Sequence, residues 1–118
     1  MKDDRLYLIH ILECADRIAD YTRGGREEFL SDTKTQDAVI RNFEIIGEAA
    51  KRVSDGVRGL APDIPWRRIG GFRDILIHQY EGVDLHAVWL VVERELPSLK
   101  RSIEHVLAQL ASPEDGGS

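Results

Sequence analysis

Apolar residues recur at steps of three and four along three stretches of the chain, and this spacing places them on one face of an α-helix. The first stretch covers residues 8–19, the second residues 39–53 and the third residues 85–110. No alternation of apolar and polar residues, the pattern typical of a half-buried β-strand, interrupts them. We therefore predict an all-α fold, an up-and-down helical bundle of four to five helices.

The ends of the first two helices are marked by residues that favour helix caps. The acidic pair at residues 3–4 is suited to cap the first helix, which we expect to end at Gly24-Gly25. Residues 27–30 should then form a single helical turn. The cluster Ser31-Asp32-Thr33 is suited to cap the second long helix, which we expect to end near Asp55-Gly56.

Glycine and proline residues shape the second half of the chain. We expect residues 57–65 to form a loop that leads into a short helix starting at Trp66. Gly70-Gly71 should interrupt or bend that short helix. Pro97 lies inside the last apolar stripe and should kink the helix near Leu96, because proline removes a backbone donor and crowds the preceding turn.

The chain has 118 residues, which suits one domain with one core. We expect residues 1–111 to form the helical domain and residues 112–118, which are poor in apolar side chains, to form a disordered tail. No apolar run approaches the roughly 18 to 20 residues of a membrane span. The start of the chain lacks the pattern of a secretory signal, and Cys14 is the single cysteine, so we expect a cytoplasmic protein.

Basic residues are concentrated in one segment of an acidic chain. The whole chain has a net charge of −5, but residues 51–73 carry six basic and two acidic side chains, a net charge of +4. A basic segment of this kind fits local binding to a phosphate backbone. The alternative is that these side chains lie on solvated helix faces.

The stretch from Arg73 to Tyr80 concentrates reactive side chains. Arginine is a permanent cation suited to phosphate, and histidine is suited to proton transfer near neutral pH. Arg73 and His78 therefore suggest phosphodiester chemistry without a metal, with Arg73 as the stabilising cation and His78 as the acid or base. Asp74 could orient either side chain, or it could lower the local affinity for phosphate.

Helix geometry separates these side chains. At about 100° per residue, Arg73 and Tyr80 fall within roughly 20° of one face, while His78 lies about 140° from Arg73. Either the helix ends or distorts near His78, or Arg73 and His78 meet only across two chains. Metal-free cleavage of RNA needs a base, an acid and a cation, and a two-fold dimer would supply two histidines to one cleft.

Each reactive side chain also has a purely structural interpretation. His78 could be a partly buried histidine bonded to a backbone carbonyl, and Arg73 could form a surface ion pair with Asp74 or Glu81. Tyr80 could pack its ring in the core. The sequence contains no metal-binding pair, nucleophile elbow or phosphate-binding glycine loop, so we expect no metal and no cofactor.

The spacing Arg, four residues, His, one residue, Tyr resembles the signature of the HEPN superfamily, and more narrowly the HepT family of bacterial toxin ribonucleases. Flanking segments occur in the order that HepT-like chains show, and the resemblance covers most of residues 5–110. These segments are Ile45 to Ala50, Pro62 to Trp66, Gly70-Gly71-Phe72, Gly82-Val83-Asp84 and Val88-Trp89.

The resemblance implies a HEPN-like homodimer that cleaves RNA through Arg73 and His78 at its interface. It also implies a minimal nucleotidyltransferase as the cognate antitoxin, which would adenylylate Tyr80 and produce O-AMP-tyrosine. Whether the homodimer and the antitoxin form a larger complex stays open. Arg67 and Arg68 are candidate RNA contacts, and Asp74 is a candidate auxiliary residue. Two other functions stay open: a catalytically silent module that binds a nucleotide or docks the nucleotidyltransferase, and a plain dimerisation bundle.

Overall fold

The computed structural model describes residues 2–79 and 81–111, and every regular element within them is helical. This confirms the all-α prediction. The predicted tail, residues 112–118, lies outside the described residues. In chain order the elements are α1 (Lys2–Tyr21), α2 (Arg26–Ser31), α3 (Thr33–Arg52), α4 (Asp55–Leu60), α5 (Trp66–His78), α6 (Leu85–Leu90), a π-helical turn η1 (Val91–Glu95) and α7 (Leu96–Leu110).

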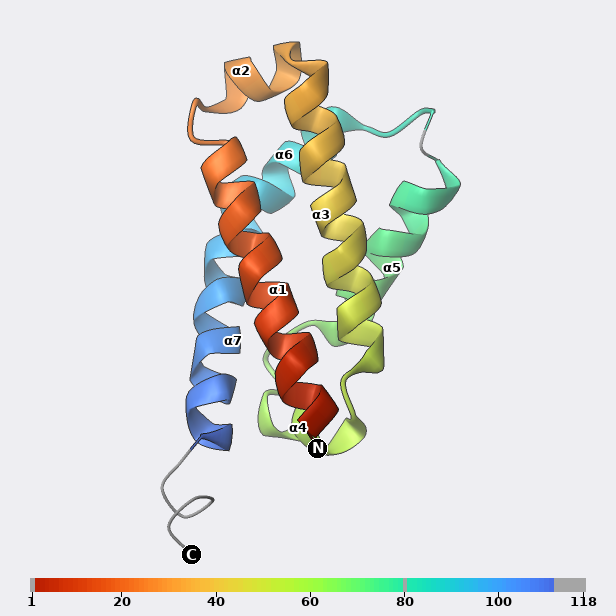
Figure 1. Cartoon of the computed structure of the whole chain (residues 1–118). Helices are drawn as coiled ribbons and strands as arrows, with labels where there is room; N and C mark the ends of the chain where they lie inside the picture. The colour runs from red at the N-terminus through yellow and green to blue at the C-terminus, as the bar shows by residue number, and fades with distance from the viewer. Residues whose placement is uncertain (1, 80, 112–118) are drawn as a thin grey trace, which may run out of the picture.

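The long helices pack in the spatial order α7, α1, α3, α5. Helix α1 lies against α3 along its length, α5 packs on the other side of α3, and α7 packs on α1. Figure 1 shows α1 and α3 side by side and α7 beside α1, while α6 passes behind the upper parts of α1 and α3 and leads through η1 into α7. Helices α2 and α4 are single short turns at opposite ends of the bundle (Figure 1).

The core is built from the three apolar stripes that predict the long helices. Fully buried side chains come from α1, α3, α6 and α7, and each contributes roughly 1.5 to 3 kcal/mol when it leaves water. The short α2 adds Phe29, whose ring lies 5.7 Å from that of Trp89. Among the buried residues are Leu8, Ile11 and Ile18 of α1, Val39 and Ile46 of α3, Val88 of α6, and Ile103 and Val106 of α7.

The prediction of a loop over residues 57–65 is wrong in its first part, because α4 begins at Asp55 and ends at Leu60. Helix α3 accordingly ends before the predicted Asp55-Gly56. The Ser54 hydroxyl caps α4 by accepting a hydrogen bond from Val57 N at 3.3 Å, and the Val57 side chain is buried. A cap and one buried side chain are enough to hold a single turn against a folded core.

The acidic pair at residues 3–4 does not precede the first helix, since α1 begins at Lys2. Asp4 has a different role. Its carboxylate is buried and accepts hydrogen bonds from Ser54 N and Ser54 Oγ, both at 2.8 Å. Asp4 therefore ties α1 to the residue that caps α4.

Helix α5 begins at Trp66 as predicted, but Gly70-Gly71 does not interrupt it, and it continues to His78. Gly70 is buried where α5 meets α3, and a Cβ atom there would lie 3.1 Å from Lys51 Cε. The glycine thus serves close helix packing. The interaction with α3 holds the helix together despite two residues of low helix propensity.

The predicted kink near Leu96 coincides with a change of helix type, since the π-helical turn η1 ends at Glu95 and α7 begins at Leu96. Leu96 N donates to Val91 O, five residues back, in place of the usual four. Pro97 then lies in the first turn of α7.

Candidate active site at the end of helix α5

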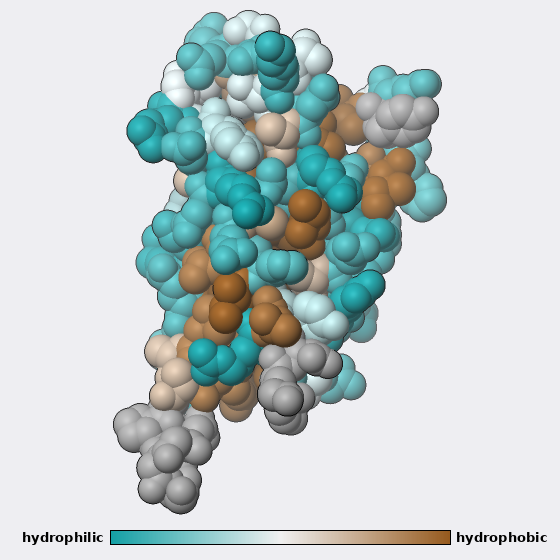
Figure 2. All heavy atoms as spheres, viewed as in Figure 1, coloured by the Kyte–Doolittle hydropathy of each residue, from teal (hydrophilic) through white to brown (hydrophobic). Residues whose placement is uncertain are grey.

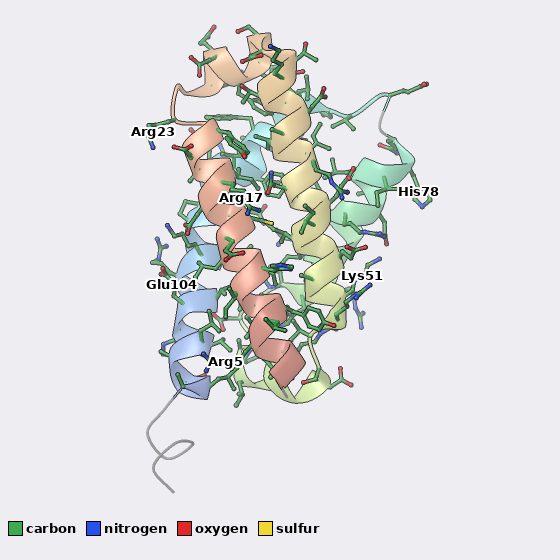
Figure 3. The ribbon with its side chains drawn as sticks, in the orientation of Figure 1. Arg5, Arg17, Arg23, Lys51, His78 and Glu104 are labelled. Atoms are coloured by element: carbon green, nitrogen blue, oxygen red, sulfur yellow. The ribbon has the colours of Figure 1, made fainter. Side chains whose placement is uncertain are left out.

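The residues singled out in the sequence lie in the last two turns of α5. The helix ends at His78, and Gln79 N closes it by donating to Ile75 O at 3.0 Å. The helix stays regular between Arg73 and His78, so the two side chains leave it on different sides. His78 is exposed and points outward from the end of α5 (Figure 3). Tyr80 lies outside the described residues.

Arg73 lies against α3 and is largely shielded from water, with 28% of its side chain exposed. Its Nη1 atom donates to Asp74 Oδ1 at 3.3 Å, and its Nη2 atom lies 3.8 Å from Glu48 Oε2. A Cβ atom on Gly47 would lie 2.2 Å from Arg73 Cβ. Glycine at position 47 is therefore what allows the stem of Arg73 to lie on α3.

Asp74 binds two cations. Besides Arg73, Lys51 Nζ donates to Asp74 Oδ1 at 2.6 Å. The hydrogen bond from Lys51, followed by the one from Arg73, holds the pKa of the Asp74 carboxyl below its usual value. Asp74 therefore stays ionised beside Arg73 and is part of the site.

Helix α3 contributes Gly47, Glu48 and Lys51 to this site, and sequence reasoning missed the roles of Gly47 and Lys51. The only signal for them was Gly47 itself. An unexplained glycine in the middle of a long helix indicates a close approach by another segment. The pattern could not show which segment approaches, because the partner side chain lies on a different helix.

The basic segment over residues 51–73 does not form one continuous surface for phosphate. Arg58 donates to Ala50 O at 2.9 Å and so satisfies the end of α3. Arg68 donates to Glu95. Arg67 and Arg68 are exposed, but they leave α5 roughly 120° to 140° away from Arg73, so the structure does not bring them together with it.

A groove of about 970 Å³ separates α5 from η1 and α7, and no pattern in the sequence predicts it. Arg67 and Arg68 lie on one wall, with Arg94 and Glu95 on the other. The Arg68–Glu95 ion pair joins the two walls. The lining of the groove is mainly apolar and includes Phe43, Ile46, Ile69, Phe72, Ile75, Leu96 and Leu99.

The opposite face, formed by α1 and α3, is mainly hydrophilic with scattered hydrophobic patches (Figure 2). Within the described ranges, no three His, Cys, Asp or Glu side chains lie close enough together to hold a metal ion. None of the helices described is both long and apolar enough to cross a membrane.

Relatives of this chain carry ribonuclease names. A protein of Thermococcus cleftensis named "Probable ribonuclease HepT" is 48% identical over 99 residues, which cover 83% of this chain and 90% of that protein. A Methanocaldococcus jannaschii protein named "Putative RNase MJ1216" is 36% identical over 97% of this chain and 95% of its own length.

A second M. jannaschii protein, "Gamma-glutamylcyclotransferase and putative RNase MJ0434", is 44% identical over 92% of this chain and 50% of its own length. No solved structure is similar enough to count as a match. The family model described as "Ribonuclease HepT-like" matches residues 11–106, a range that includes all of α5 and its contacts with α3. The chain belongs to the HepT-like ribonuclease family.

Proposed function

We propose that this protein is a metal-independent endoribonuclease and the toxin of a toxin–antitoxin pair in the cytoplasm. Arg73 stabilises the charge that develops on the phosphate, and His78 transfers protons. One observation carries the proposal: in a member of a ribonuclease family, the last two turns of α5 carry an exposed histidine and, on another side of the helix, an arginine held by two carboxylates.

The reaction requires two chains. One His78 deprotonates the ribose 2′-hydroxyl, whose oxygen attacks the phosphorus atom. The bond from phosphorus to the 5′-oxygen breaks, and the His78 of a second copy protonates that leaving oxygen. The products are a 2′,3′-cyclic phosphate and a 5′-hydroxyl. A two-fold homodimer supplies both histidines, which a single regular helix carrying one His78 does not.

The remaining predicted residues have supporting roles in the proposal. Asp74 is auxiliary and tunes Arg73, while Arg67 and Arg68 contact the RNA backbone further along α5. Tyr80, two residues beyond the end of α5, is the switch. A cognate nucleotidyltransferase adenylylates it to O-AMP-tyrosine, which adds bulk and a negative charge at the site and so opposes the binding of RNA phosphate.

The test is cleavage of mixed cellular RNA by the purified protein, with a chelator present and with Tyr80 shown by mass spectrometry to be unmodified. We expect the wild type to cut RNA, and His78→Ala and Arg73→Ala to lose activity by about 100-fold or more. His10→Ala is the matched control, because His10 is an exposed histidine on α1. Wild-type protein that leaves every RNA intact would contradict the proposal.

The silent docking module is the second candidate, and the apolar groove of about 970 Å³ favours it because such a groove can receive a partner. The variant His78→Ala separates the two functions. A nuclease loses toxicity in cells while still binding the nucleotidyltransferase. For a docking module, the His78→Ala variant and the wild type have the same effect on cell growth and bind the nucleotidyltransferase equally well.

A further inference from the structure

Helices α3 and α5 pack closely at two glycines, and at each glycine a long side chain of the other helix lies on the backbone. The stem of Arg73 lies on Gly47 of α3, where an added Cβ would be 2.2 Å from Arg73 Cβ. The stem of Lys51 lies on Gly70 of α5, where an added Cβ would be 3.1 Å from Lys51 Cε and 3.2 Å from Lys51 Cγ. Each helix therefore holds the long cationic side chain of the other against bare backbone.

The packing of the Lys51 stem on Gly70 brings the Lys51 ammonium group to Asp74. Asp74 follows Gly70 by one helical turn, so the Lys51 stem that lies on Gly70 points along α5 toward the carboxylate. The distance from Lys51 Nζ to Asp74 Oδ1 is 2.6 Å. Figure 3 shows Lys51 leaving α3 on the side of α5.

Lys51 and Arg73 compete for one oxygen atom. Asp74 Oδ1 accepts from Lys51 at 2.6 Å and from Arg73 at 3.3 Å, so the lysine holds the shorter bond. Glu48 lies 3.8 Å from Arg73 as a second carboxylate. With two cations and two carboxylates, the cluster has no net charge, and a phosphate that approaches Arg73 must compete with both carboxylates.

We propose that Lys51 is a positioning residue that acts on Arg73 through Asp74: by holding the Asp74 carboxylate, it keeps Asp74 from neutralising the Arg73 guanidinium. Arg73 then has capacity left for the phosphodiester of the RNA substrate. The effect on catalysis depends on the proposed ribonuclease activity, whereas the competition for Asp74 does not. In this role Lys51 acts through Asp74 and not through contact with substrate: its ammonium group donates to Asp74, and its stem lies on Gly70.

A double-mutant cycle tests how Lys51 acts. The value of kcat/KM for mixed-sequence single-stranded RNA is measured for wild type, Lys51→Met, Asp74→Asn and the double variant. We expect Lys51→Met to lower kcat/KM by about two- to fivefold, the size of an exposed ion-pair coupling. In the Asp74→Asn background the same substitution should have no effect. Equal losses in both backgrounds, or no loss in the wild type, would overturn the proposal.

Two further variants separate positioning from stability. Lys100→Met is the matched control, since Lys100 Nζ pairs with Asp16 Oδ1 at 2.7 Å between α7 and α1, with exposure similar to that of the Lys51 pair. Lys100→Met should lower the free energy of unfolding by as much as Lys51→Met does, and it should leave kcat/KM unchanged. Lys51→Arg keeps a cation on Asp74 and should restore most of the activity that Lys51→Met loses.

A measurement without RNA keeps this proposal distinct from the proposed function. The Asp74 carboxyl pKa is followed by NMR in the wild type, Lys51→Met, Arg73→Met and the double variant. If Lys51 competes with Arg73, then Arg73→Met raises the Asp74 pKa more when Lys51 is absent than when it is present. An equal rise in both backgrounds would refute the competition, even in a protein that cleaves no RNA.

Discussion

At the scale of single residues, one buried polar group in this fold is held by a partner far away in sequence. This group is Asp4, whose carboxylate joins the first turn of α1 to Ser54, which lies 50 positions later. Burial acts to raise the pKa of Asp4, but the two hydrogen bonds from Ser54 outweigh it and the net pKa is lowered. Folding therefore favours the ionised form.

This predicts a pH-dependent effect of Asp4→Asn. A lowered pKa in the folded state contributes stability above the unfolded value of about 3.9, and this contribution is lost as pH falls. At pH 7 we expect Asp4→Asn to lower the free energy of unfolding by about 1 to 3 kcal/mol, measured by urea denaturation. The difference from wild type should shrink toward pH 3. Asp37→Asn, on an exposed position of α3, is the control, and an equal loss at all pH values would contradict the explanation.

At the scale of secondary-structure elements, glycines in helix interiors have opposite effects on stability at different positions. Gly47 of α3 faces the stem of Arg73, whereas Gly71 of α5 has nothing within 4 Å of an added Cβ. Both lie inside regular helix, where alanine is intrinsically the better residue by roughly 0.5 to 1 kcal/mol. Only packing against a second helix distinguishes them.

Substitution by alanine should therefore have opposite effects at the two positions. Gly47→Ala forces α3 and α5 apart and should destabilise the protein by about 1 to 3 kcal/mol. Gly71→Ala should stabilise it by up to about 1 kcal/mol, because no neighbour must move. Thermal denaturation measures both. If the two variants lose the same stability, the close approach at Gly47 is not what matters.

At the scale of the whole molecule, the long helices leave one side of the bundle open. Helix α5 packs on α3 and α7 packs on α1, and the groove between α5 and α7 is lined with apolar side chains such as Phe72 and Leu99. Ile75, with 54% of its surface exposed, lies at this groove. An apolar surface of this kind is consistent with the assembly that the proposed reaction needs.

The proposed reaction predicts that His78→Ala chains inactivate the wild-type chains with which they form dimers. If each active site needs His78 from both chains, subunit exchange with an approximately tenfold excess of His78→Ala should lower activity per wild-type chain by about tenfold. RNA cleavage is measured before and after exchange, so that the unexchanged mixture is the control. Activity per wild-type chain that stays constant after exchange would show that each chain works alone.

The fold was largely predictable because helix formation is a local property. The steps of three and four predicted the apolar faces of α1, α3 and the run from α6 to α7. Pro97 marked the place where the hydrogen-bond pattern of this run changes. The short α4 was not predictable, because one buried apolar side chain, Val57, makes no repeating pattern, and the capping residue Ser54 is held by the distant Asp4.

For the candidate site, the sequence by itself determined the reactive residue types and their order along α5, including the geometric consequence that Arg73 and His78 leave a regular helix on different sides. Tertiary structure alone decided what surrounds them. Glu48, Lys51 and Gly47 meet Arg73 and Asp74 because two helices cross closely, and that crossing depends on shape and charge contributed by both. Periodicity within one segment specifies which face is apolar, but it does not specify which polar side chain from another segment will lie against it.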